Sequence, residues 1–328
     1  MSPGWSVTNP TKFRKGKCEF LASWRLGDCL KQLAVRLLLI LLVFGAACGR
    51  APSGPPPAAH PSGAVHRIVS LSPSATEILY GVGVFDRVVA VSNYCTYPPE
   101  VARLPRVGNW LNANAEQLAE LRPDLVVMTE SQAHFLDAKL QALGFKSLVV
   151  RSQTLADAYD AIAAIGAAVG KTAEGKALAE RTRGEVEAVR VRAAGLAHPR
   201  VLCVVDRVPG TLRELYTATY GSFIAELIEV AGGTSVAPRA NTGYGKLTKE
   251  ALVVLDPEII IDMIQGAKGR LGEDPRRVWG ELAQVAAVRN GCVVALDDTA
   301  FLHPSQLVAV SAQRFAEIIH PEVFARGR

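Results

Sequence analysis

The chain has 328 residues, which is long enough for two domains, and it carries a formal net charge of +5. Its surplus of positive charge lies within residues 1–47, so the rest of the chain is close to neutral. This distribution removes the electrostatic argument for a nucleic-acid-binding protein.

The first segment has the pattern of an export signal. Basic residues precede an apolar run over 37–47, which is shorter than the ~20 residues that a membrane-spanning helix needs. Small residues lie directly before Cys48, as in bacterial lipoprotein signals, in which that cysteine carries the lipid; an ordinary cleaved signal is the alternative. We predict a signal peptide over 1–47, with translation starting near Val35.

Residues 48–63 are rich in proline, glycine and serine and cannot bury a core, so they are predicted to be a tether. With Cys48 lipidated, the protein would be held in the periplasm or at the cell surface by its lipid anchor alone.

Beyond the tether, short apolar runs alternate with helical patterns. Strands are predicted over 67–71, 88–91, 125–128, 148–150, 201–205, 259–263 and 293–296. Helices are predicted over 75–80, 115–121, 134–143, 222–231, 249–255 and 304–319. This alternation favours an α/β fold with parallel sheets, in an N-terminal lobe over 64–153 and a C-terminal lobe over 198–328.

The connection over 154–197 has no proline and a strongly helical composition. Gly170 is its best break point, and the second piece, 171–196, would form a rigid helix along both lobes. A rigid connection predicts little hinge closure.

One segment occurs twice, at an offset of 134 residues. Trp110, Glu116 and Pro123 in the first copy correspond to Tyr244, Glu250 and Pro257 in the second. This repetition predicts two lobes of similar construction facing each other across a shared cleft.

The duplicated residues allow two interpretations. Asn114 and Thr248 are typical helix N-caps, which places Glu116 and Glu250 in first helical turns, where a carboxylate complements the helix dipole. Alternatively, the two glutamates project towards a two-fold symmetric partner that carries arginines. The paired aromatics Trp110 and Tyr244 are either hydrophobic staples or flat surfaces that grip a large ligand.

Ligands of such sheets bind outside the carboxyl ends of the strands. The candidates there are Ser72 and Pro73, Tyr94, Arg207 and Asp297, with Tyr216 and Phe301 extending the aromatic surface. No dinucleotide loop, nucleophile elbow or zinc motif is found, and Cys95, Cys203 and Cys292 lack zinc spacing. We therefore predict neither an enzyme nor a metal site, against a remote alternative of a two-lobed α/β enzyme such as a glycosyl transferase.

Several motifs together resemble a known family. They are the runs Arg67–Glu77, Ser92–Pro99, Val107–Trp110, Leu121–Val126 and Leu227–Gly233. In this order they resemble the cobalamin and iron-siderophore substrate-binding proteins of bacterial ABC importers, with the cobalamin binders most similar. The resemblance implies two Rossmann-like lobes joined by a long rigid helix, with the ligand in the cleft between the lobes.

The resemblance also implies roles for single residues. Glu116 and Glu250 match the acidic pair that docks on arginines of the permease dimer. Trp110 and Tyr244 match aromatics that contact cobalamin, and Asp297 matches an acid of the cleft. Phe301 replaces an arginine, Val205 an aromatic and Ala231 a half-cystine, so no disulfide is expected at Ala231.

Together these features predict an exported monomer that binds cobalamin or a related corrinoid as its ligand, uses no cofactor, and delivers the ligand to an ABC importer. A ferric siderophore or haem is the alternative ligand, and Arg207 is then the main basic candidate in the cleft.

Overall fold

The computed structural model describes residues 64–109, 112–240, 242–263, 275–296 and 299–325. They belong to one compact unit, Gly63–Arg328. The predicted signal, Cys48 and the tether lie outside the described residues, so these predictions stay open. In the described part of the chain, no helix is both long and apolar enough to cross a membrane.

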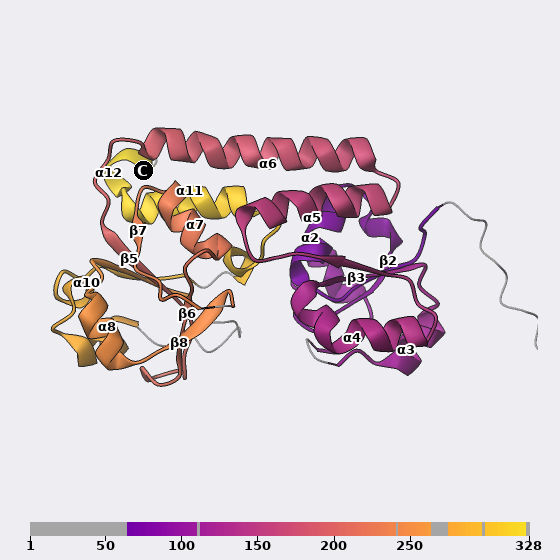
Figure 1. The fold of residues 1–328 in the computed structure, drawn as a ribbon, viewed down its shortest axis with the longest axis horizontal. Helices are drawn as coiled ribbons and strands as arrows, with labels where there is room; N and C mark the ends of the chain where they lie inside the picture. Colours follow the sequence, from indigo (N-terminus) through magenta and orange to yellow (C-terminus); the bar gives the residue numbers. More distant parts are fainter. Residues whose placement is uncertain (1–63, 110–111, 241, 264–274, 297–298, 326–328) are drawn as a thin grey trace, which may run out of the picture. The chain divides into compact units, whose positions relative to one another are not determined.

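The unit contains two β-sheets (Figure 1). The first sheet has the order β2-β1-β3-β4 and is parallel throughout. Its strands are β1 (Ile68–Ser70), β2 (Val88–Val91), β3 (Leu125–Thr129) and β4 (Ser147–Val150). All four were predicted, because each is a short apolar run with a helix before or after it.

The second sheet has the order β10-β9-β5-β6-β8, and β7 pairs with β5. Its strands are β5 (Arg200–Asp206), β6 (Leu215–Ala218), β7 (Thr234–Ser235), β8 (Tyr244–Leu247), β9 (Ile259–Asp262) and β10 (Val293–Ala295). Strands β6 and β8 run antiparallel, so this sheet is mixed rather than purely parallel as predicted.

The parallel parts of the two sheets repeat one arrangement. Ile68 of β1 pairs with Val88 of β2 and with Leu125 of β3. In the second sheet, β5 pairs in the same way with β7 on one side and β9 on the other, and β10 follows β9 as β4 follows β3. The duplication seen in the sequence is therefore a duplication of architecture, and the predicted two-lobed α/β fold is confirmed.

Helices cover both faces of each sheet. They are α2 (Pro73–Gly81), α3 (Ala115–Leu121), α4 (Glu130–Ala142), α5 (Leu155–Ala168), α6 (Thr172–Ala193), α7 (Phe223–Val230), α8 (Lys249–Leu255), α9 (Pro275–Trp279), α10 (Ala286–Arg289), α11 (Val308–Ile319) and α12 (Pro321–Phe324). Short 3₁₀ turns add η1 (Phe85–Arg87), η2 (Pro99–Arg103), η3 (Gly280–Leu282) and η4 (Thr299–Leu302).

Alternate strand residues point to different cores. Val69 packs with Leu118 of α3 and Leu136 of α4, and Leu202 packs with Leu252 of α8 on the corresponding face of the second sheet. Ile68 and Val201 point to the opposite faces, which share one core with α2, α5, α6, α7 and α11. Helices α3 and α8 therefore lie on the sheet faces that point away from the shared core.

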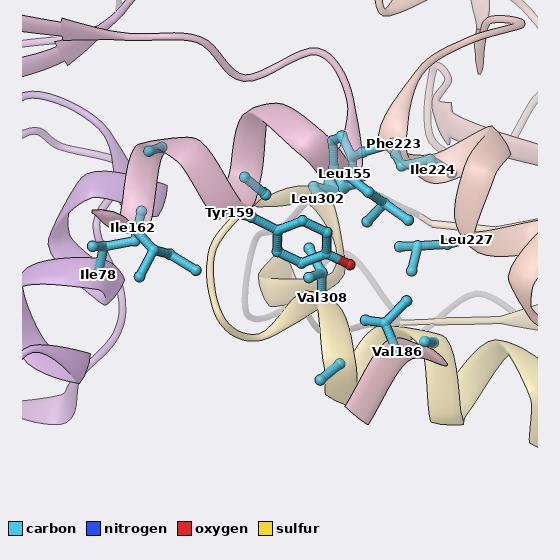
Figure 2. Packing of buried hydrophobic residues seen from close by; sticks show 14 of the residues in the cluster. Ile78, Leu155, Tyr159, Ile162, Val186, Phe223, Ile224, Leu227, Leu302 and Val308 are labelled. Carbon is cyan, nitrogen blue, oxygen red and sulfur yellow. The ribbon is translucent and has the colours of Figure 1, made fainter. Parts of the chain in front are cut away.

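The shared core joins the two halves directly (Figure 2). Tyr159 and Ile162 of α5 lie among Ile78 of α2, Leu227 of α7 and Val308 of α11. Because such an interior is close-packed, sliding one sheet past the other would disrupt many apolar contacts. This packing supports the limited closure expected from a rigid connection.

Helix α6 has 22 residues and is about 33 Å long at 1.5 Å per residue. It lies against α5, α7 and α11, and Figure 1 shows it running past the helices of both halves. The break between α5 and α6 falls at Gly170, whose φ of +77° belongs to the left-handed region that favours glycine. The predicted break point is confirmed.

Helices α5 and α6 approach each other closely at Gly166 and Gly175. A Cβ on Gly166 would lie 2.7 Å from the Gly175 Cα and 2.9 Å from the Lys171 carbonyl oxygen. Both contacts are with backbone, which cannot rotate away. Small residues are therefore required where these helices cross.

Gly166→Ala is expected to lower the free energy of unfolding by about 1–3 kcal/mol, because it overpacks this crossing. Gly184→Ala is the matched control in the same helix pair, since its Cβ would meet nothing within 4 Å. That control should stabilise the protein by about 0.5–1 kcal/mol through helix propensity alone. Urea unfolding measures both, and equal effects would contradict the close approach.

Candidate functional site

The two duplicated glutamates lie at matching places. The Asn114 side chain accepts from the Glu116 and Gln117 amides at 3.1 Å, and the Thr248 side chain accepts from the Ala251 amide at 3.2 Å. Both predicted N-caps are confirmed. Glu116 and Glu250 are exposed in the first turns of α3 and α8. These two helices lie on the sheet faces that point away from the shared core.

The C-terminal ends of α3 and α8 are also duplicated. Arg122 and Asp256 end these helices in the left-handed conformation, with φ of 43° and 39°. Arg67 donates to the Leu121 carbonyl at 2.7 Å, and Arg200 donates to the Asp256 carbonyl at 2.8 Å. Each helix is thus fixed to the first strand of its sheet.

A carboxylate just after each helix accepts a further hydrogen bond from the same arginine. The backbone amides of Arg67 and Arg200 both donate at 2.9 Å, to Asp124 and Glu258 respectively. In return, the amides of Asp124 and Glu258 donate to the Arg67 and Arg200 carbonyls at 2.8 Å. The two glutamate-bearing helices are therefore held by similar hydrogen bonds, except that Arg67 binds the last helical carbonyl of α3 and Arg200 binds the C-cap carbonyl of α8.

The surroundings of the two glutamates differ in one respect. Lys249, beside Glu250, forms an ion pair with Glu281, whereas Glu116 is preceded by Ala115. Hydrogen bonds from its own amide and from Thr248, followed by the charge of Lys249, lower the pKa of the Glu250 carboxyl. Glu250 therefore keeps its charge to a more acidic pH than an ordinary glutamate.

In the first half, the predicted cleft residues lie at strand ends. Ser72 and Pro73 follow β1 and begin α2, where the Ser72 hydroxyl accepts from the Ala75 amide at 3.1 Å. Both are buried, so they shape the base of the loop rather than its surface. Tyr94 follows β2 and is 54% exposed, which suits a contact with a ligand. Trp110 lies outside the described residues.

In the second half, Tyr216 lies on β6 and Tyr244 begins the neighbouring strand β8. Tyr244 is 40% exposed, and desolvation followed by the neighbouring Cys203 raises the pKa of its hydroxyl. Phe301 is partly buried against the shared core, and Asp297 lies outside the described residues.

Phe301 is held next to the first half by a buried carboxylate. Glu77 of α2 accepts from Ser305 at 2.5 Å and lies 2.7 Å from the His303 Nδ1. The backbone carbonyl of Glu77 also accepts a hydrogen bond from the Gln306 side chain at 2.8 Å. These bonds tie the segment after η4, which carries Phe301, to the helix that follows β1.

Arg207 is placed differently from the prediction. Its Nε donates to the Asp262 carboxylate at 3.0 Å, and both side chains are 0% exposed. Trp279 donates to the same carboxylate oxygen at 2.7 Å. This buried cluster favours a structural role for Arg207, so the described conformation does not support it as a direct ligand contact.

A pocket of about 400 Å³ opens between residues of both halves. Glu130, Arg151 and Gln153 come from the first half, and Thr219, Tyr220 and Thr242 come from the second half. The sequence prediction did not include Arg151. The signal was present, since Arg151 directly follows the predicted strand 148–150.

The three cysteines of the described chain are free thiols, with Cys95 and Cys203 buried and Cys292 half-buried. Among the described residues, no group of three or more His, Cys, Asp or Glu side chains could hold a metal ion. The structure therefore has exposed tyrosines at the strand ends of both halves, and it has two helices, α3 and α8, that carry exposed glutamates. This is the arrangement of a two-lobed substrate-binding protein.

Comparison with known proteins gives the same class. The profile of the periplasmic binding protein family matches residues 68–300. The chain is 30% identical over 262 residues to the uncharacterized ABC transporter substrate-binding lipoprotein YvrC of Bacillus subtilis, covering 79% of this chain and 81% of that one. This chain belongs to the periplasmic binding protein family.

Two solved structures with different ligands in their names are similar to about the same degree. The periplasmic vitamin B12 binding protein BtuF of Vibrio cholerae has a TM-score of 0.67 and 26% identity, covering 80% of this chain and 99% of that one. The periplasmic heme-binding protein RhuT of Roseiflexus sp. RS-1 has a TM-score of 0.69 and 25% identity, covering 80% and 100%.

Proposed function

We propose that this protein is the extracytoplasmic substrate-binding component of an ABC importer and that it captures cobalamin or a related corrinoid. The observation that carries the importer role is the pair of similarly held helices, α3 and α8, that present Glu116 and Glu250. Exposed carboxylates on two like-built halves suit a two-fold symmetric partner that carries arginines. Lipidation at Cys48 would keep the protein close to that partner.

The ligand proposal depends on the aromatic residues at the strand ends. Tyr94, Tyr216, Tyr244 and Phe301 offer flat, rigid surfaces of the kind that stack on a large, partly apolar ring system. The similarity to BtuF supports a corrinoid. The similarity to RhuT makes haem the second candidate, and with Arg207 buried we place a ferric siderophore after both.

Calorimetry with cyanocobalamin, cobinamide, haem and a ferric siderophore tests the ligand class. Sub-micromolar binding of a corrinoid at one ligand per chain is expected. Sub-micromolar binding of haem alone would select the second candidate, and binding of the siderophore alone would overturn the proposal.

Tyr244→Ala should weaken binding of the preferred ligand about three- to tenfold, because an aromatic stacking contact contributes about 0.5–1.5 kcal/mol. Phe135→Ala is the matched control, since Phe135 is an aromatic on α4 that is 55% exposed, against 40% for Tyr244. The same titration measures both variants. Unchanged affinity for Tyr244→Ala would remove Tyr244 from the binding surface.

A further inference from the structure

The pocket between the two halves differs in chemistry from the aromatic surfaces beside it. Glu130 follows β3, Arg151 follows β4 and Thr219 follows β6, so three strand ends converge on it. Gly243, which also lines it, directly precedes Tyr244. The pocket is therefore adjacent to a proposed stacking residue and within reach of a substituent on the same ligand.

A buried acid anchors one cation at this pocket. The Arg151 Nε donates to Asp157 at 3.0 Å, while 76% of the Arg151 side chain is exposed. The other Asp157 oxygen accepts from the Gln153 and Thr154 amides at 3.2 and 3.0 Å. Arg151 is thus held at Nε, and the outer end of its guanidinium group faces solvent.

A second cation rests on one of the residues that line the pocket. The Arg239 guanidinium group lies over the Tyr220 ring, 4.3 Å from the ring centroid, and Tyr220 lines the pocket. A guanidinium group that rests on an aromatic face keeps its N–H groups directed outwards in the plane of the fork. The pocket therefore has one lining arginine, Arg151, and a second arginine stacked on a lining tyrosine of the other half.

The other polar groups of the pocket are largely satisfied by the protein. Glu130 accepts from the amide and the hydroxyl of Ser152, both at 3.1 Å. Ser222 donates to the Thr219 carbonyl at 2.7 Å, and Thr242 donates to the Tyr244 carbonyl at 2.6 Å. The carboxylates of Glu130 and Asp157 balance the two cations in charge, but they are held by backbone and hydroxyl donors, whereas most of the Arg151 side chain is exposed and Arg239 rests only on the Tyr220 ring.

We infer that this pocket binds an anionic substituent, a carboxylate or a phosphate, at the edge of the ligand whose ring stacks in the cleft. Guanidinium groups bind such oxyanions through paired, charge-assisted hydrogen bonds. The inference rests on the proposed function, because it needs a tetrapyrrole in the cleft. The oxyanion could be a carboxylate of haem or the phosphate in the nucleotide loop of cobalamin.

The test compares ligands that carry the oxyanion with analogues that lack it. Haem is compared with its dimethyl ester, and cyanocobalamin with cobinamide, which lacks the phosphate-bearing loop. Wild type should prefer one charged ligand over its analogue by about tenfold to a hundredfold, as expected for hydrogen bonds to a charged group. The pair that shows the preference identifies the source of the anion.

Arg151→Gln with Arg239→Gln should reduce that preference to about onefold without weakening binding of the analogue that lacks the oxyanion. Arg181→Gln with Arg277→Gln is the control, because it removes two exposed arginines from α6 and α9. Thermal melting of each variant checks folding. The preference should persist in the control.

The outcomes separate the two proposals. If wild type binds a tetrapyrrole without preferring the charged form, or if the double variant keeps the preference, the anionic pocket is wrong while the proposed function stands. If no tetrapyrrole binds to wild type, both are wrong.

Discussion

Glu116→Ala combined with Glu250→Ala is expected to abolish ligand import and to leave ligand affinity within twofold of wild type. Both carboxylates are exposed on faces remote from the shared core, and their helices are held by bonds that the substitutions do not touch. Close charge pairs at an interface contribute about 1.5 kcal/mol or more each. Losing two should therefore weaken docking roughly a hundredfold or more.

Uptake of labelled ligand into proteoliposomes that contain the partner permease measures import, and calorimetry measures affinity. Glu185→Ala with Glu229→Ala is the matched control, because it removes two exposed carboxylates from α6 and α7. Import should survive in the control. A parallel loss of ligand affinity in the Glu116 and Glu250 variant would show that these residues do not act by docking.

The lowered pKa of Glu250 predicts how its contribution to docking changes with pH. A carboxyl with a lowered folded pKa is fully charged above the ordinary glutamate value and loses its charge only as the pH falls through the lowered value. The contribution of Glu250 to docking should therefore be constant from neutral pH down through mildly acidic pH.

Asp262→Ala is expected to lower the free energy of unfolding by about 3–5 kcal/mol, because it leaves the buried Arg207 guanidinium group without its carboxylate. Trp279 would lose its acceptor at the same time. Equilibrium unfolding in urea measures the loss. An effect below about 1 kcal/mol would contradict the buried ion pair.

Two further variants test whether the stability loss of Asp262→Ala comes from leaving the Arg207 charge buried without its partner. Arg207→Met with Asp262→Leu replaces the pair by apolar side chains and should recover most of the lost stability, since such replacements are often neutral. Breaking the exposed Arg183–Glu180 pair on α6 is the control and should cost less than about 1 kcal/mol.

The parts of the fold that depend on local signals could be predicted from the sequence. The bounds of α3 and α8 were predicted to the residue, because an N-cap, a first-turn glutamate and a following proline mark both. Helix α4 begins four residues before its prediction, since its N-cap Thr129 also ends an apolar strand. Helix α11 begins four residues after its prediction, at Val308.

The features that sequence reasoning missed depend on tertiary pairing. Strand β6 pairs antiparallel with β5, and strand β8 pairs antiparallel with β6. Both strands contain polar residues or a glycine, so neither forms the apolar run from which a strand is predicted. Arg207 directly follows β5, and its partner Asp262 ends β9, 55 positions later in the chain. An arginine at a strand end therefore looked like a cleft residue although it is buried.

Hydrogen–deuterium exchange of residues 64–328 with and without the preferred ligand tests the central claim that both halves hold one ligand. Protection is expected in both the loop after β2, around Tyr94, and the segment of the second half that includes Tyr220 and Tyr244, with α3 and α8 unchanged. Protection confined to one half, or centred on α3 and α8, would contradict a ligand site shared between the two lobes.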